Sequence, residues 1–264
     1  MKRKRIIVAG CGNMGGAILS SLNKSGEYEI EGVEKRSDIR DNFSGEKIKM
    51  SGSLSSVSFA DILIAAVKPK DMLLFIREIN ESGFQTELFV SVAAGLKIEQ
   101  IKGELKKNVP ICRVMPNTPL LVGEGLSCIA FPGADEKSFY TVDRIFSLTG
   151  QTLRVNEEDM DAVTALSGSG PAYFFLIGEI MKEFAEQRGF SSSDASLLAA
   201  ATVRGAGALM MRQGVDFTAL RKAVTSPEGT TEAAVSLLEK NGLRKIFLEA
   251  LEAAEKRSAE LSGD

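Results

Sequence analysis

Residues 10–15, with the sequence GCGNMG, constrain the fold of this chain more than any other segment. They follow the apolar run 6–9 and precede a helical pattern at 17–22, so the order is strand, glycine turn, helix. In such a turn the first glycine permits a tight bend, the second lets the backbone approach a pyrophosphate, and the third lets the helix pack on the strand. The start of the helix presents free N–H groups to the phosphates. Because glycine-rich turns are common, it is this placement that favours a dinucleotide site over an ordinary β-α turn. The candidate cofactor-binding residues of the turn are Gly10, Gly12, Asn13, Met14 and Gly15.

A second predicted strand, residues 28–34, bears on the choice of cofactor. It ends in Glu34, about 20 residues past the glycines, where an acid can accept hydrogen bonds from the ribose 2′-hydroxyl of NAD. Lys35, Arg36 and Ser37 follow at once, and two cations beside a hydroxyl suit the 2′-phosphate of NADP. The sequence therefore leaves NADH and NADPH both open, together with a plain solvated strand end.

Composition excludes several classes of protein. A formal net charge of −3 over 264 residues offers no positive field for nucleic acid or for an anionic membrane surface. No apolar stretch approaches the ~20 residues of a membrane span. The three cysteines lack metal-ligand spacing, which predicts a reduced, cytoplasmic setting and no metal site. The absence of histidine excludes Ser-His-Asp triads and imidazole proton relays.

The pattern of elements divides the chain into two predicted domains. Residues 1–156 alternate strands and helices, which predicts an α/β fold with a mostly parallel sheet. Residues 157–264 show helical patterns only. Between 197 and 208 nearly every residue is apolar or small, so this helix must be buried on all sides. We expect a second subunit to cover it in a homodimer; a compact monomeric bundle is the alternative. The predicted strands are 5–10, 28–34, 61–67, 88–93, 111–115, 127–131 and 152–155, and the predicted helices include 71–80, 136–148, 157–166, 171–188, 193–212, 217–224, 231–240 and 243–261.

Ligands of an open parallel sheet bind outside the carboxyl ends of its strands. Three further segments are expected there: 66–69, which carries Lys68; 93–95, whose small side chains leave room for a ring; and 115–119, which presents the Asn117 amide. In the helical half, residues 225–231 place four hydroxyls before a helix, an arrangement that can receive a small carboxylate. A solvated lysine at 68 and a simple helix cap at 225–231 remain the alternatives.

Taken together, these motifs resemble the pyrroline-5-carboxylate reductase family over essentially the whole chain. The resemblance is carried by the glycine loop, by AVKP at 66–69, RVMPNTP at 113–119, ALSGSGPAY at 165–173, and SPEGTT at 226–231. It implies an N-terminal Rossmann domain and a C-terminal all-helical dimerisation domain that interleaves with its partner, in dimers that often form larger rings. The implied activity is reduction of 1-pyrroline-5-carboxylate to proline by hydride transfer from NAD(P)H, the last step of proline synthesis. Of the two cofactors we lean toward NADPH, with NADH left open.

The resemblance also implies roles for individual residues. Thr231 would be the catalytic residue, hydrogen-bonded to the ring nitrogen of the substrate. The substrate carboxylate would be held by Ser226, Gly229 and Thr230, in a pocket that joins one subunit's Rossmann face to the other's helices. Around the cofactor, besides the glycine loop, the implied residues are Glu34, Arg36, Ser37, Ser53, Val67, Lys68, Pro69, Ala94 and Asn117.

Three departures from the family pattern leave alternatives open. Glu34 before the basic pair leaves the cofactor preference undecided. Glu228 stands where glycine is usual, which puts a carboxylate beside the expected anion site, and Ser53 stands where an asparagine often contacts the adenosine. The alternatives are a related imine- or hydroxyacid-specific oxidoreductase and a non-catalytic regulator that senses the cofactor.

Overall fold

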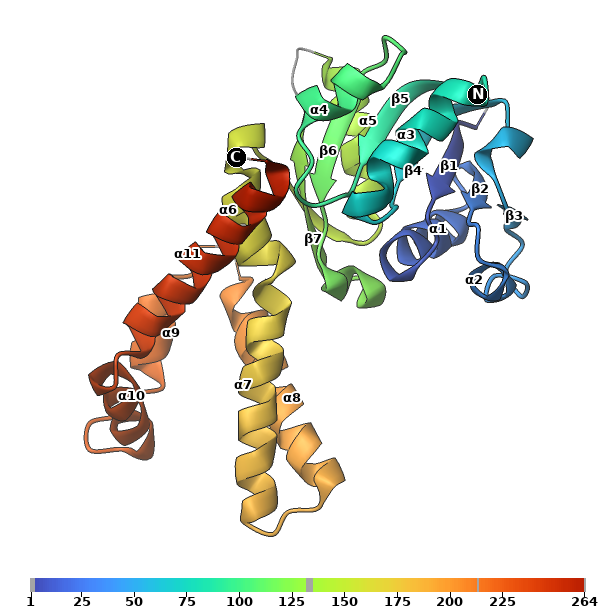
Figure 1. Cartoon of the computed structure of the whole chain (residues 1–264). Coiled ribbons are helices and arrows are strands. Elements are labelled where there is room, and N and C mark those ends of the chain that lie inside the picture. The colour runs from blue at the N-terminus through green and yellow to red at the C-terminus, as the bar shows by residue number, and fades with distance from the viewer. Residues whose placement is uncertain (1–2, 132–134, 213, 264) are drawn as a thin grey trace. The chain divides into compact units, whose positions relative to one another are not determined.

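A computed structural model describes residues 3–131, 135–212 and 214–263 (Figure 1). Its sheet has eight strands in the order β3-β2-β1-β4-β5-β6-β7-β8, and neighbouring strands are parallel except for β6 and β7. The first six positions of this order are those of a Rossmann fold, which confirms the predicted fold class. All seven predicted strands are present, and β3 was not predicted. The strands are β1 (Arg5–Ala9), β2 (Glu29–Val33), β3 (Lys49–Ser51), β4 (Phe59–Ala65), β5 (Gln85–Ser91), β6 (Ile111–Met115), β7 (Gly125–Ala130) and β8 (Gly150–Arg154).

Helices cover both faces of the sheet, because alternate residues of each strand point to opposite sides. Ile6 and Val8 pack in one cluster with side chains of α1 and α5, whereas Ile7 packs in a second cluster with side chains of α3 and α4. These helices are α1 (Asn13–Ser25), α2 (Ser37–Asp41), α3 (Met72–Glu81), α4 (Ile98–Glu104) and α5 (Glu136–Ser147), with short 3₁₀ turns η1 (Leu54–Ser56), η2 (Pro69–Asp71) and η3 (Thr118–Val122).

The rest of the chain is helical, as predicted. The predicted helix at 157–166 is a succession of a 3₁₀ turn, a short α-helix and a π turn: η4 (Glu157–Asp159), α6 (Met160–Val163) and η5 (Thr164–Gly168). The remaining elements are α7 (Gly170–Gln187), α8 (Ser192–Met210), α9 (Phe217–Ala223), α10 (Thr230–Lys240) and α11 (Leu243–Ser262).

The chain forms two compact units. The sheet unit comprises Met1–Ser169 together with Ala254–Asp264, and the helical unit comprises Gly170–Ala253. The last turns of α11 therefore belong to the sheet unit. Ser258 Oγ donates to Asp161 Oδ1 at 2.6 Å, and Gln100 Nε2 donates to the carbonyl oxygen of Ser262 at 2.9 Å. The predicted boundary after residue 156 remains an interpretation of the sequence.

The helical unit buries few large side chains. Within α7 and α8 the buried positions are Gly170, Ala185, Ala195 and Ala199, whereas large apolar side chains such as Phe175 and Leu197 are exposed. A single copy of this unit therefore leaves large apolar side chains in contact with water, which is typical of a protein–protein interface. None of the helices in the described part of the chain is long and apolar enough to cross a membrane.

Candidate cofactor and substrate sites

Backbone hydrogen bonds align the strand ends at the carboxyl edge of the sheet. The Ala66 N–H donates to the carbonyl of Ala9 at 2.7 Å, and the Val92 N–H donates to that of Ala65 at 3.1 Å. These bonds continue the ladder past the last strand residues, so the loops after β1, β4 and β5 leave from neighbouring points. The edge brings together the predicted cofactor residues Gly10, Gly12, Asn13, Met14, Gly15, Val67, Lys68, Pro69 and Ala94.

The glycine loop has the shape that a pyrophosphate requires. Gly10 has φ +84°, and a Cβ there would lie 2.7 Å from the Ala66 carbonyl oxygen. A Cβ on Gly15 would collide with the carbonyl oxygen of Gly10, so the third glycine allows helix and strand to approach. A Cβ on Gly12, the N-cap of α1, would meet nothing within 4 Å. The backbone at the start of α1 is thus open to a ligand, and the loop fits a dinucleotide.

Glu34 is fixed against this loop. Its Oε2 accepts a hydrogen bond from the Cys11 N–H at 2.9 Å, and its Oε1 accepts one from the Arg36 N–H at 3.0 Å. Burial, and secondarily the charge of Glu34, raise the pKa of the Cys11 thiol to about 12. The thiol therefore stays protonated near neutral pH and supplies no thiolate to the loop.

The basic residues after β2 are held by acids of the same chain. Lys35 Nζ lies 2.9 Å from Glu78 Oε2, and Ser53 Oγ donates to Glu78 Oε1 at 3.2 Å. Arg36 pairs with Asp38 at 2.5 Å, and this hydrogen bond lowers the pKa of the Asp38 carboxyl. Ser37 is the first residue of α2. Glu78 is a residue that the sequence did not single out.

Two other predicted residues behave differently from each other. Lys68 is exposed and is the N-cap of η2, and its backbone carbonyl accepts a hydrogen bond from the Asp71 N–H at 2.9 Å. Asn117 uses both ends of its amide: Nδ2 donates to Ser167 Oγ at 3.2 Å, and Oδ1 accepts from the Leu126 N–H at 2.9 Å. The structure therefore gives Asn117 a role in joining the loop after β6 to η5 and β7; its contact with cofactor stays a prediction.

The predicted substrate segment of the helical unit is a β-turn followed by a helix. The Gly229 N–H donates to the Ser226 carbonyl at 3.0 Å, with Pro227 second in the turn and Glu228 third at φ +59°. Proline second and a left-handed residue third are typical of a type II turn, which favours glycine at the position of Glu228. Gly229 caps α10, and a Cβ on it would collide with Ser226 Oγ. The close approach of this hydroxyl to the helix start thus requires the glycine.

The first turn of α10 carries the remaining predicted substrate residues. Amides in a first helical turn have no carbonyl of their own helix to bond, so those of Thr230 and Thr231 are directed at whatever lies before the helix. Thr231 is half-buried and Thr230 is exposed. The Glu228 N–H is already engaged by Glu232 Oε2 at 2.7 Å. Among the predicted substrate residues, Ser226, Gly229, Thr230 and Thr231 are brought together at one helix end.

A buried cation supports the sheet unit from within. Arg113 of β6 is 3 % exposed and lies 3.6 Å from Glu157, whose Oε1 also accepts a hydrogen bond from the Ile98 N–H at 2.6 Å. Burial lowers the pKa of the Arg113 guanidinium, and the charges of Glu157 and Asp161 act against that shift. In the sequence, Arg113 stood out only as a member of the motif at 113–119. Its partner Glu157 lies 44 positions later, and no sequence pattern connects the two residues.

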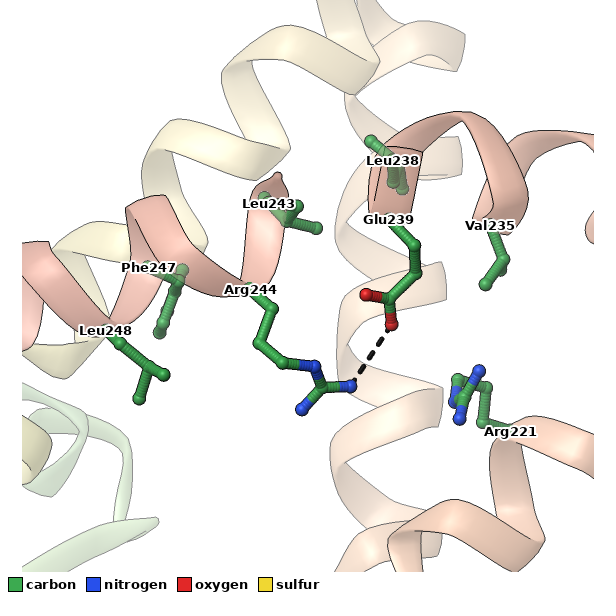
Figure 2. A pocket seen from close by; sticks show the side chains of 8 residues that line it. All are labelled: Arg221, Val235, Leu238, Glu239, Leu243, Arg244, Phe247 and Leu248. Atoms are coloured by element: carbon green, nitrogen blue, oxygen red, sulfur yellow. Dashed lines mark hydrogen bonds and ion pairs between the residues drawn. The ribbon is translucent and has the colours of Figure 1, made fainter. Parts of the chain in front are cut away.

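Other possible sites are few. In the described residues no group of three or more Cys, Asp or Glu side chains could hold a metal ion. A hollow of about 360 Å³ lies between α10 and α11, with Arg221 beside it (Figure 2). Its lining is mostly apolar, and an ion pair of 3.1 Å joins Arg244 and Glu239 at its side. None of the predicted site residues lines it.

Comparison with known proteins decides the family. Residues 157–261 match the family model described as pyrroline-5-carboxylate reductase dimerisation, and residues 5–95 match the model described as NADP oxidoreductase coenzyme F420-dependent. The pyrroline-5-carboxylate reductase of Corynebacterium melassecola is 35 % identical over 97 % of this chain and 98 % of its own. The chain belongs to the pyrroline-5-carboxylate reductase family.

Further family members agree over the same length. The reductase of Pseudomonas aeruginosa is 34 % identical over 99 % of this chain and 98 % of its own. The solved structure of the Coxiella burnetii reductase has a TM-score of 0.89, 33 % identity and 99 % coverage of both chains. A Plasmodium falciparum reductase solved with NADP bound has a TM-score of 0.86 and 25 % identity, again with 99 % coverage of both chains. The resemblance stated from the motifs, and the fold it implied, are confirmed.

Proposed function

We propose that this chain reduces 1-pyrroline-5-carboxylate to proline with NAD(P)H. The observation that carries the proposal is that one chain, matched to this family from end to end, holds both an open glycine cradle and a hydroxyl-rich turn at a helix start. The helical unit would make the protein a homodimer, since its large apolar side chains are exposed within one chain. The cytoplasm is the proposed location, in keeping with three free, buried cysteines.

The reaction suits a chain without histidine. A cyclic imine is readily protonated in water, and an iminium carbon is electrophilic, so the protein has to orient the substrate rather than supply a strong acid. Bound NAD(P)H would deliver the hydride to the C=N carbon. The Thr231 hydroxyl would hold the ring nitrogen, while the first-turn amides of α10 with Ser226 and Thr230 would hold the carboxylate.

The decisive assay follows the absorbance of reduced nicotinamide with purified protein and 1-pyrroline-5-carboxylate. Substrate-dependent loss of absorbance supports the proposal. Cofactor binding without consumption would favour the cofactor-sensing regulator. Consumption only with other imines, or with the oxo acids that are reduced to hydroxyacids, would favour a related oxidoreductase.

A variant of the glycine loop, residues 10–15, tests whether the cofactor binds there. Because a Cβ on Gly12 meets nothing within 4 Å, Gly12→Val should fold normally while its side chain occupies the space of the pyrophosphate. We expect loss of cofactor binding with little change in melting temperature. Gly45→Val, at another glycine with open space, is the matched control and should bind cofactor as the parent does. Equal cofactor binding by Gly12→Val would contradict the placement of the cofactor on this loop.

A further inference from the structure

The segment after β2 and its neighbours form a cluster of balanced charge. This cluster, the ribose cluster, consists of three acidic and three basic residues: Glu34, Lys35, Arg36, Asp38, Arg40 and Glu78. A 2′-phosphate adds close to two negative charges to the ribose and is bound tightly where cations are in excess. The count of charges therefore offers NADPH no net attraction over NADH.

The basic members of the cluster are moreover engaged. The Lys35 ammonium is paired with Glu78, and the Arg36 guanidinium is paired with Asp38. Arg40 NH1 donates to the backbone carbonyls of Glu34 and Lys35 at 2.7 and 2.8 Å. A phosphate would have to compete with these carboxylates for Lys35 and Arg36. Partial burial by itself raises the pKa of Glu78, but the bonds from Lys35 and Ser53 and the charge of Lys35 lower it overall, so the carboxylate that holds Lys35 stays charged.

The acidic member nearest the glycine loop is fixed in place. Glu34 accepts hydrogen bonds from the amides of Cys11 and Arg36, one on each carboxylate oxygen. A carboxylate oxygen has a second lone pair for a further donor. At the end of the second strand of this fold such an acid can accept a hydrogen bond from the ribose 2′-hydroxyl, and it repels a 2′-phosphate at the same point.

We propose that Glu34 is a specificity-determining residue that makes this chain bind NADH in preference to NADPH. The inference rests on the proposed function, because it concerns the cofactor of the same site. It reverses the preference for NADPH that was expected from the sequence, where Glu34 and the basic pair left both cofactors open.

The test is isothermal titration calorimetry of the full chain with NADH and with NADPH, in the absence of 1-pyrroline-5-carboxylate. We expect the Kd for NADPH to exceed that for NADH by about tenfold or more. Glu34→Gln keeps one side-chain oxygen as an acceptor but loses the charge, so it should reduce that ratio by about tenfold, mainly by tightening NADPH. Glu87→Gln, an exposed acid on β5, makes the same change of charge away from the loop and should leave the ratio as it is. The melting temperature with each cofactor gives a second readout and shows that the variants fold.

The titrations test the preference for NADH, the role of Glu34 and the proposed function separately. Tighter binding of NADPH by the parent chain would overturn the inference and leave the proposed reductase standing. A preference for NADH that Glu34→Gln does not alter would overturn the role of Glu34. Binding of neither cofactor would overturn the inference and the proposed function together.

Discussion

The two units of this protein handle apolar side chains in opposite ways. The sheet unit contains the largest fully buried side chains, among them Phe84, Phe89 and Phe146, and it packs a cluster on each face of its sheet. In the helical unit Phe175 is 62 % exposed and Leu197 is 68 % exposed. The sheet unit has a hydrophobic core of its own within one chain, whereas the helical unit has an exposed apolar surface that a second copy of the chain would cover.

Because of this difference in burial, we expect mutations in the two units to have different effects. In the sheet unit, polar groups such as Arg113 and Glu34 are satisfied by partners of the same chain. In the helical unit, the N-cap of α10 has no side-chain hydrogen bond, and large side chains of α7 and α8 are exposed. Substitutions in the first unit should act on folding of one chain, and those in the second on assembly and substrate.

The largest effect is expected at an exposed leucine of the helical unit. Leu197→Glu should dissociate the dimer and lower stability by several kcal/mol, since it places a charge where apolar contact with a second chain is needed; about 3 kcal/mol is a reasonable scale. Leu74→Glu, at a leucine of α3 that is 64 % exposed, is the matched change in the sheet unit and should cost under about 0.5 kcal/mol. Sedimentation at micromolar concentration measures the first effect. If Leu197→Glu and Leu74→Glu both keep the oligomeric state of the parent, the exposed apolar surface of the helical unit is not a subunit interface.

A loss of stability of similar size is expected at the buried cation. Arg113→Ala leaves Glu157 without its charged partner and opens a cavity in β6, so stability of the sheet unit should fall by about 2 to 4 kcal/mol. Arg77→Ala, at an exposed arginine of α3, serves as the control. Urea unfolding followed by circular dichroism gives the difference. A loss at Arg113 no greater than at Arg77 would mean that this network does not stabilise the unit.

Thr231→Ala sharpens the assignment of chemistry to the helical unit. If its hydroxyl holds the ring nitrogen, kcat/KM should fall by the worth of one hydrogen bond, about 1 to 3 kcal/mol, with the Kd for cofactor unchanged. Thr218→Ala, in the first turn of α9, is a control on a comparable helix start. Unchanged kinetics would remove Thr231 from the mechanism.

The smallest effect is expected at the strained turn. Glu228→Gly relieves a left-handed backbone at a residue with a side chain, which is worth about 1 kcal/mol at most after the extra freedom of the unfolded glycine is counted. It also removes a carboxylate beside the proposed anion site, so KM for 1-pyrroline-5-carboxylate should fall. Glu228→Ala keeps the strain but removes the charge. If only the glycine variant lowers KM, backbone conformation rather than charge is responsible.

The fold was predictable where the pattern is local. The glycine turn between strand and helix, the alternation up to residue 156 and the helices beyond it are all signalled by neighbouring residues. Strand β3 was missed because its three residues, Lys49, Met50 and Ser51, are too few to show alternation at a sheet edge. The π turn at 164–168 was missed because a single widened turn does not change the helical periodicity.

The candidate site was predictable in its members more than in their partners. Glu34 was identified from its distance to the glycines, but its bond to the Cys11 amide spans 23 positions and leaves no pattern. The pairing of Lys35 with Glu78 is likewise a product of the folded sheet, and it alters the meaning of a basic pair that reads as a phosphate site in sequence. Glu228 was recognised as a departure from the family, while the positive φ that explains the usual glycine needed coordinates.

The return of α11 to the sheet unit sets an order of events during synthesis. Gly95, at φ +66°, lies so close to Leu261 that a Cβ there would be 2.9 Å from the leucine Cβ, and Ser258 and Ser262 are bonded to the same unit. As the polypeptide leaves the ribosome, the sheet can form early, because domains fold from the N-terminal side. Its last contacts cannot close until the final helix has emerged. The intervening 84 residues, Gly170–Ala253, are thus made while the surface that receives the end of α11 is still bare, and a nascent chain stalled before that point would expose both that surface and the apolar helices to chaperones.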